Sequence, residues 1–234
     1  MNWKKAMRIA LIVLGALIVG AIVVGVLNAL VADGKWSFGW SDYHYDDNAY
    51  TVGDGTVYAK DLTEISVDWI DGNVHIVVCD DEYPSVTEQA ETLLTDDSRM
   101  RYMISEDGRT LSVKYRKSSS FFGVSENKNK DLTLRIPRKM LAQLTLVDVY
   151  VRSSNLTVEG IDVKKLSICS EKGDVTLLLA SDAGFVLTNE MHDGKTPTID
   201  FAVEQRDGAY VCGDGRSQID VKADRGSVSV KKMK

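Results

Sequence analysis

The chain has 234 residues and a net charge of −6 at pH 7, with 28 lysines and arginines against 34 acidic residues. Three of the basic residues stand among the first eight positions, so the rest carries 25 minus 34, or −9, which excludes nucleic acid as a partner. Three scattered cysteines exclude a disulfide scaffold, and no Cys-x-x-Cys pair indicates zinc binding or thiol redox chemistry.

An apolar segment follows the basic leader. Residues 9–31 contain no charged side chain and would form a helix about 35 Å long, enough to cross a hydrocarbon core of about 30 Å. Lys4, Lys5 and Arg8 precede this segment and acids follow it, so the positive-inside rule places residues 1–8 in the cytoplasm and the C-terminal domain outside. We expect a single-pass signal anchor that binds the lipid bilayer of the cell membrane.

A cleaved signal peptide is the alternative to this anchor. Leu30, Val31 and Ala32 form an imperfect cleavage sequence, but the apolar region of a signal peptide is usually only about 7 to 15 residues long.

Residues 32–58 predict a juxtamembrane linker, because they are rich in Gly, Asp and aromatic residues that settle at a membrane interface. The acids Asp42, Asp46 and Asp47, with His44, lack the spacing of a calcium loop and are typical of a solvated linker.

Alternation of apolar and polar residues begins within the domain predicted at residues 59–234. Residues 65–69 and 74–78 alternate on both sides of Asp-Gly-Asn at 71–73, which predicts a β-hairpin with Trp69 facing the core. The same pattern predicts a second hairpin over residues 102–115.

The segments between and after these hairpins are less regular. Residues 85–91 predict a further strand, residues 92–100 a helical turn or a loop, and residues 117–130 a long exposed loop.

The rest of the domain consists of short apolar doublets that recur every 19 to 24 residues. One series runs from Leu146 through Ile168 and Leu187 to Val211, and the other from Val158 through Leu177 and Phe201 to Val221. This period predicts an all-β fold, a β-solenoid of the single-stranded β-helix type that follows the N-terminal hairpins and the transmembrane helix.

The same register predicts free thiols. Cys169 and Cys212 occupy equivalent places two coils apart, about 9.6 Å, which exceeds the limit of about 7 Å for a disulfide.

Four segments carry a resemblance to a known family: residues 65–76 (ISVDWIDGNVHI), 107–113 (DGRTLSV), 134–137 (LRIP) and 170–177 (SEKGDVTL). They resemble the putative-adhesin domain family of unknown function, found in membrane-anchored proteins of Gram-positive bacteria. The resemblance implies a β-helix and a place in the cell envelope, and it implies no chemistry.

No catalytic, cofactor-binding or metal-ligating residue is assigned. His44, His75 and His192 lack metal-ligand partners at a suitable spacing, and we expect His75 to face solvent. Asp80, Asp81 and Glu82 are the densest acids, and their place between a strand and Tyr-Pro is typical of a solvated corner.

Three functions fit these patterns. The first is a non-enzymatic membrane-anchored cell-surface protein, an adhesin or a module that binds an unidentified cell-envelope component or protein partner. The second is a β-helix enzyme acting on polysaccharide, and the third is an accessory subunit of an envelope-stress sensor or transporter.

Overall fold

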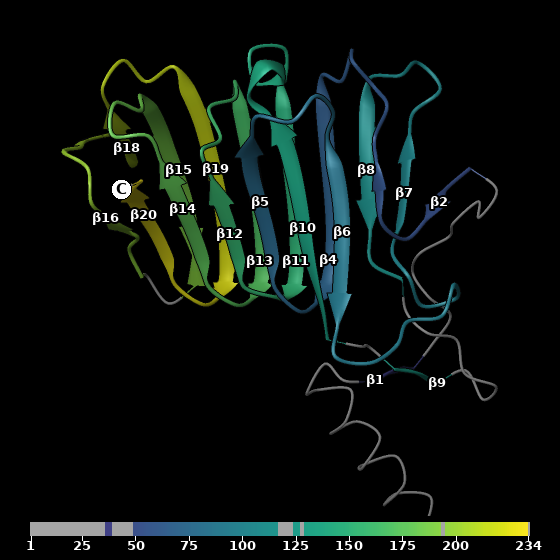
Figure 1. Cartoon of the computed structure of the whole chain (residues 1–234). Helices are drawn as coiled ribbons and strands as arrows, with labels where there is room; N and C mark the ends of the chain where they lie inside the picture. The colour runs from purple at the N-terminus through teal and green to yellow at the C-terminus, as the bar shows by residue number, and fades with distance from the viewer. Residues whose placement is uncertain (1–35, 39–48, 117–123, 127–128, 193–194, 234) are drawn as a thin grey trace, which may run out of the picture.

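The computed structural model describes residues 36–38, 49–116, 124–126, 129–192 and 195–233, and most of its strands form two facing sheets (Figure 1). One sheet has ten strands, in the spatial order β17 (Glu204–Arg206), β18 (Ala209–Cys212), β15 (Phe185–Met191), β19 (Ser217–Arg225), β13 (Lys165–Lys172), β11 (Leu146–Ser153), β4 (Glu64–Asp71), β8 (Thr110–Lys114), β7 (Arg101–Ile104) and β2 (Thr51–Val52). The other has eight, in the order β16 (Thr198–Ile199), β20 (Val228–Lys232), β14 (Val175–Leu179), β12 (Leu156–Glu159), β5 (Val74–Cys79), β10 (Lys130–Pro137), β6 (Ser85–Ala90) and β3 (Gly55–Thr56).

Three short elements lie outside these sheets. β1 (Trp36–Phe38) and β9 (Val124–Glu126) form a separate antiparallel pair, so part of the loop predicted at 117–130 is a strand. A 3-10 helix, η1 (Arg138–Met140), follows β10 directly.

The predicted hairpin at residues 65–78 is wrong. β4 belongs to the ten-stranded sheet and β5 to the eight-stranded sheet, so Gly72 and Asn73 form a β-arch that carries the chain across the core. Alternation and a turn sequence are common to hairpins and arches, and only the pairing partners distinguish them. The second hairpin is confirmed, because β7 and β8 pair antiparallel with Tyr102 opposite Val113. The strand predicted at 85–91 is β6.

Four such arches form the central coils of a solenoid, confirming the predicted class of fold. In β4–β5, β11–β12, β13–β14 and β19–β20, two residues connect a strand of the ten-stranded sheet to a strand of the eight-stranded sheet. Each strand then pairs in parallel with its counterpart in the next coil. Parallel pairing places equivalent side chains of successive coils in rows.

Chain order and spatial order differ at the end of the solenoid. The last coil of the chain, β19–β20, lies between β13–β14 and β15–β16. The predicted alignment of Ile168 with Leu187 is therefore wrong, because Ile168 pairs with Val221 and Leu187 pairs with Ile219. Val158 does pair with Leu177, as predicted. Leu146 and Ile168 lie in neighbouring strands, but their predicted alignment is wrong because Ile168 pairs with Val149.

The order of the strands also changes the relation between the cysteines. β19 and β15 separate Cys169 in β13 from Cys212 in β18, so three strand spacings, about 14 Å, lie between their strands. The structure leaves Cys79, Cys169 and Cys212 as free thiols.

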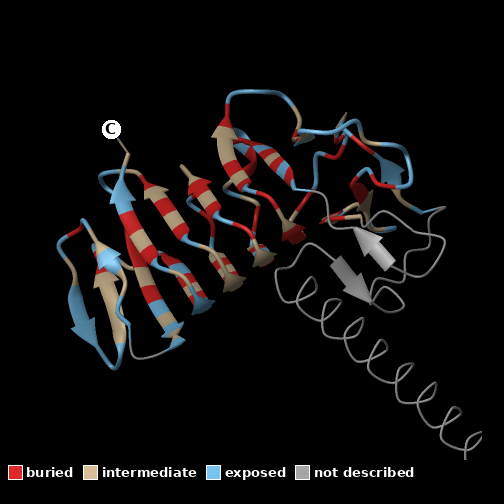
Figure 2. Ribbon diagram, turned by 90° about the horizontal axis from the view of Figure 1, so that it is seen from below, coloured by how far each residue is buried: buried red, intermediate tan, exposed pale blue. Residues whose placement is uncertain are grey.

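The core is a continuous apolar layer between the sheets, as the alternating buried and exposed positions in Figure 2 show. Trp69 is fully buried with Ile65 and Val67, which confirms the predicted inward face of β4. The sheets begin before residue 59, because β2 pairs with β7, β3 pairs with β6, and Val57 is buried.

The predicted span at residues 9–31 and the acids near His44 lie outside the described residues. Within the part of the chain that the structure describes, no helix has the length and apolarity needed to cross a membrane.

Glycine is required where the coils approach each other most closely. Gly173 has a φ of +121°, and a Cβ there would lie 2.1 Å from the carbonyl oxygen of Ser154 in the neighbouring coil. Gly226 has a φ of +142°, and its Cβ would lie 2.1 Å from the oxygen of Gly173. A side chain at either corner would separate two coils.

We expect Gly173→Ala to lower the free energy of unfolding by at least about 3 kcal/mol, because backbone strain and a clash with backbone act together. Gly108→Ala is the matched control, since Gly108 also has a positive φ (+73°) but open space around its Cβ. The control should cost about 1 to 2 kcal/mol in the same urea titration. Equal losses would show that the close approach of the coils is unimportant.

Candidate functional site

The acidic corner predicted from the sequence is solvated and paired. Asp80, Asp81 and Glu82 are exposed, Asp81 accepts a hydrogen bond from Arg135 at 3.0 Å, and Asp80 accepts one from Arg138 at 3.2 Å. The hydrogen bond from Arg135 holds the pKa of Asp81 below its usual value. A carboxyl group that stays ionised is unsuited to act as a general acid.

The described histidines are surface residues, as expected for His75. His75 Nε2 lies 3.2 Å from Glu159, and His192 Nδ1 lies 3.7 Å from Asp224. Among the described residues, no group of three His, Cys, Asp or Glu side chains is arranged to hold a metal ion.

The outer face of the ten-stranded sheet is cross-linked by its own polar groups. Lys165 pairs with Asp220 at 3.2 Å, Lys222 pairs with Glu190 at 3.2 Å, and Tyr150 donates to Glu171. Burial and the bond to Glu171 raise the pKa of Tyr150.

A hollow of about 460 Å³ on this face contains Cys169, and burial raises the pKa of its thiol. This hollow is a poor candidate for a reactive site, since the charged groups that line it, Glu190, Asp220 and Lys222, already have partners and its thiol is held in the less reactive protonated form.

The outer face of the eight-stranded sheet is different. The register of seven strands aligns one outward position in each, with β6 antiparallel to β10 and the other pairs parallel. We call this set the hydroxyl row: Thr87, Thr133, His75, Thr157, Thr176, Ser229 and Thr198. Six strand spacings of about 4.8 Å give this row a length of about 29 Å. Six of the seven side chains carry a hydroxyl group, so the row is a regular array of hydrogen-bonding groups.

A second polar row runs along the arch corners beside the hydroxyl row. Asp131 accepts hydrogen bonds from Asn73, Asn73 accepts one from Asn155, and Asp174 accepts two from Ser227 at 2.8 Å. The hydrogen bonds from the Ser227 backbone and hydroxyl lower the pKa of Asp174. This corner ladder fixes the edge of the face.

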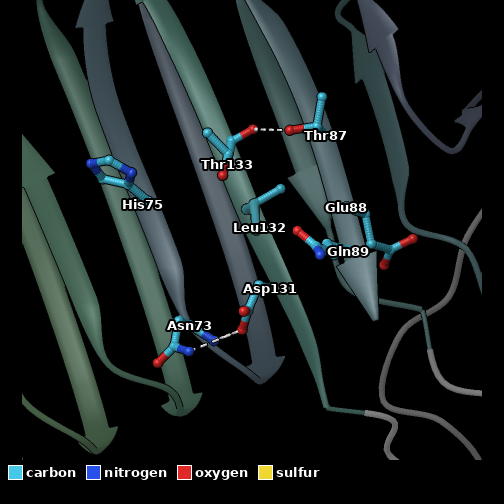
Figure 3. Close-up of a pocket in the computed structure, with 8 residues that line it drawn as sticks. All are labelled: Asn73, His75, Thr87, Glu88, Gln89, Asp131, Leu132 and Thr133. Atoms are coloured by element: carbon cyan, nitrogen blue, oxygen red, sulfur yellow. Dashed lines mark hydrogen bonds between the residues drawn. The ribbon is translucent and has the colours of Figure 1, made fainter. Parts of the chain in front are cut away.

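A pocket of about 440 Å³ lies at one end of the hydroxyl row, over β6, β10 and β5 (Figure 3). It is lined by Asn73, His75, Thr87, Glu88, Gln89, Asp131, Leu132 and Thr133. Figure 3 shows Asn73, in the arch before β5, and Asp131, in β10, pointing toward each other, and a hydrogen bond of 3.0 Å joins them. Thr87 donates a weaker hydrogen bond of 3.5 Å to the carbonyl oxygen of Thr133.

Several groups in this pocket keep unused hydrogen-bonding capacity. Within the described part of the chain, no hydrogen bond engages the Thr133 hydroxyl, the Gln89 amide or Oδ2 of Asp131. His75 uses Nε2 toward Glu159, and Nδ1 has no described partner. These groups can therefore bind a polar molecule without first breaking internal bonds.

A buried ion pair supports the pocket from inside. Lys130 Nζ lies 2.6 Å from Glu88, and both side chains are almost inaccessible, with exposed fractions of 0% and 1%. Lys130 also donates to the carbonyl oxygens of Ser98 at 2.7 Å and Arg116 at 3.0 Å, and Glu88 accepts from the Met100 backbone at 2.9 Å. The pair links β10 to β6 directly beneath the pocket.

Aromatic rings enclose this ion pair. Lys130 Nζ lies 4.0 Å from the ring centroid of Tyr115, which packs edge-on against Trp69 with centroids 5.2 Å apart. Trp69 donates its indole N–H to the backbone oxygen of Lys130 at 2.8 Å. Lys130 was assigned to the end of an exposed loop from the sequence, and that assignment is wrong because Glu88 and Tyr115 stabilise its buried charge.

The hydroxyl row was not predicted, although the sequence contains a signal for it. The doublets of the eight-stranded sheet read LTL at 132–134, LTV at 156–158, VTL at 175–177 and VSV at 228–230. A hydroxyl residue at the centre of each doublet indicates a row once the strands are known to pair in parallel.

The model of the Toastrack DUF4097 family matches residues 62–234. The chain belongs to this family. No curated protein sequence matches the Toastrack chain.

One solved structure reaches the TM-score at which its fold can be compared with that of this chain. A putative cell adhesion protein from Clostridium sporogenes ATCC 15579 is 11% identical, with 79% of this chain and 100% of that chain covered and a TM-score of 0.50. A putative adhesin from Bacteroides fragilis NCTC 9343 is 12% identical, with 78% and 97% covered and a TM-score of 0.37.

Removing the buried cation should destabilise the Toastrack domain. We expect Lys130→Met to lower the free energy of unfolding by about 3 to 5 kcal/mol, because Glu88 is left as an uncompensated buried charge. Lys164→Met, at an exposed lysine, should change it by less than about 0.5 kcal/mol.

The double variant Lys130→Met with Glu88→Leu should recover part of the loss, since no unpaired charge remains. Urea unfolding followed by fluorescence measures all three variants. A loss in Lys130→Met no larger than that in Lys164→Met would contradict a stabilising role for the ion pair.

Proposed function

We propose that this Toastrack protein is a non-enzymatic binding protein of the cell surface. In this proposal, residues 9–31 anchor it in the membrane and the solenoid is presented outside the cell. The observation that carries the binding function is the outer face of the eight-stranded sheet, with its hydroxyl row and open pocket. The name of the Clostridium sporogenes structure, a putative cell adhesion protein, agrees with this function.

The geometry supports binding better than catalysis. The acids at 80 and 81 are each engaged by an arginine, and the carboxylates beside the pocket are also engaged, Asp131 by Asn73 and Glu159 by His75. The hydroxyl row carries groups that recognise a polar surface and that lack the nucleophile–base pairing of a hydrolase.

The binding face can be tested with full-length protein in lipid nanodiscs and isolated cell-wall material. Thr157→Arg places a long charged side chain in the middle of the hydroxyl row and should abolish co-sedimentation with the wall. Ser66→Arg places the same side chain on the outer face of the ten-stranded sheet and should leave co-sedimentation unchanged. Equal binding by both variants would overturn the assignment of the binding face.

The orientation can be tested on cells whose wall admits protease. Protease added to intact cells should remove the domain, because Lys4, Lys5 and Arg8 favour a cytoplasmic N-terminus. A domain that is protected in intact cells and digested after lysis would contradict the proposed surface location.

A further inference from the structure

We propose that the pocket over β6, β10 and β5 binds one ring of an extended, uncharged polysaccharide, whose following rings lie along the hydroxyl row. The inference rests on the proposed function, because it names the ligand class of the same binding face. Three observations support it: the hydrogen-bonding groups of the pocket, the charge of the pocket, and the direction in which the hydroxyl row runs.

The pocket offers the mixture of groups that a sugar ring requires. Each sugar hydroxyl both donates and accepts a hydrogen bond, and the free groups of Asp131, Gln89 and Thr133 supply an acceptor, an amide that does both, and a hydroxyl. The volume of about 440 Å³ lies in the usual range for small-molecule sites, about 300 to 1,000 Å³. A single ring can therefore contact side chains from both β6 and β10.

The charge of the pocket disfavours an anionic polymer. Among the described residues, no lysine or arginine lines it, and the charge of Glu88 is balanced by Lys130 inside the domain, which leaves Asp131 as the charged group at the surface. Arg135, on the same strand as Asp131, is engaged by Asp81 at 3.0 Å. A polymer of uronic acids or phosphates would meet a carboxylate that has no cationic partner among the described residues, whereas an uncharged polymer would meet no such electrostatic repulsion.

The hydroxyl row gives the polymer a straight path. It leaves the pocket through His75 and continues across Thr157 and Thr176, with one side chain at each strand spacing of about 4.8 Å. The strands are held in register by the corner ladder and by the ion pair beneath the pocket, so the array is rigid before a ligand arrives.

Isothermal titration calorimetry of the full-length protein in nanodiscs tests this site, with cellotetraose and chitotetraose as uncharged probes and tetragalacturonate as the anionic probe. We expect saturable binding of at least one uncharged tetrasaccharide and weaker or no binding of tetragalacturonate. Tighter binding of tetragalacturonate would overturn the ligand class.

Variants locate the binding site. Thr133→Val removes the free hydroxyl and keeps the branched shape, and Gln89→Ala removes an exposed amide, so each should weaken binding about fivefold, the value of one hydrogen bond. Ser167→Ala, on the outer face of the other sheet, should leave the affinity unchanged. Unchanged affinity in both Thr133→Val and Gln89→Ala would overturn the assignment of the pocket.

The outcomes separate this inference from the proposed function. If wall material binds and Thr157→Arg abolishes that binding, but neither uncharged tetrasaccharide binds, the polysaccharide proposal fails and the binding face stands. If neither wall material nor any tetrasaccharide binds, both proposals fail.

Discussion

The structure depends on one constraint, the two-residue corner that carries the chain from one sheet to the other. At Gly173 and Gly226 the neighbouring coils approach so closely that a Cβ would overlap backbone atoms. Because the strands on either side of a corner lie in different sheets, each takes its hydrogen bonds from other coils. Stability therefore comes from long-range parallel pairing and from the apolar layer between the sheets.

Side chains point alternately to the two sides of each strand, so the residues that stabilise the core differ from those that can contact a ligand. Inward residues form the continuous core, and outward residues form rows whose chemistry is independent of the fold. The two outer faces differ in their side-chain contacts. Ion pairs such as Lys222–Glu190 link side chains on the outer face of the ten-stranded sheet, whereas the Thr133 hydroxyl on the outer face of the eight-stranded sheet has no described partner. The open face carries the proposed binding site.

Local sequence predicted the strands better than their partners. Trp69 was placed correctly because alternation reports which side of a strand is buried. The arch at Gly72 was read as a hairpin because the same turn residues serve both, and the difference lies in the pairing of distant strands. Lys130 and the hydroxyl row were missed for the same reason: Glu88 and the neighbouring coils that define them are remote in sequence.

The position of β19–β20 between two earlier coils has a consequence for how the chain acquires its structure. Until β19 and β20 have formed, β15 lacks its parallel neighbour β19 and β14 lacks its parallel neighbour β20. The C-terminal third is therefore completed by insertion, and its contacts between distant segments favour slow folding. Loss of residues 217–233 would remove an internal layer and expose apolar rows on both sides of the gap, so this solenoid cannot be shortened from its C-terminal end one coil at a time.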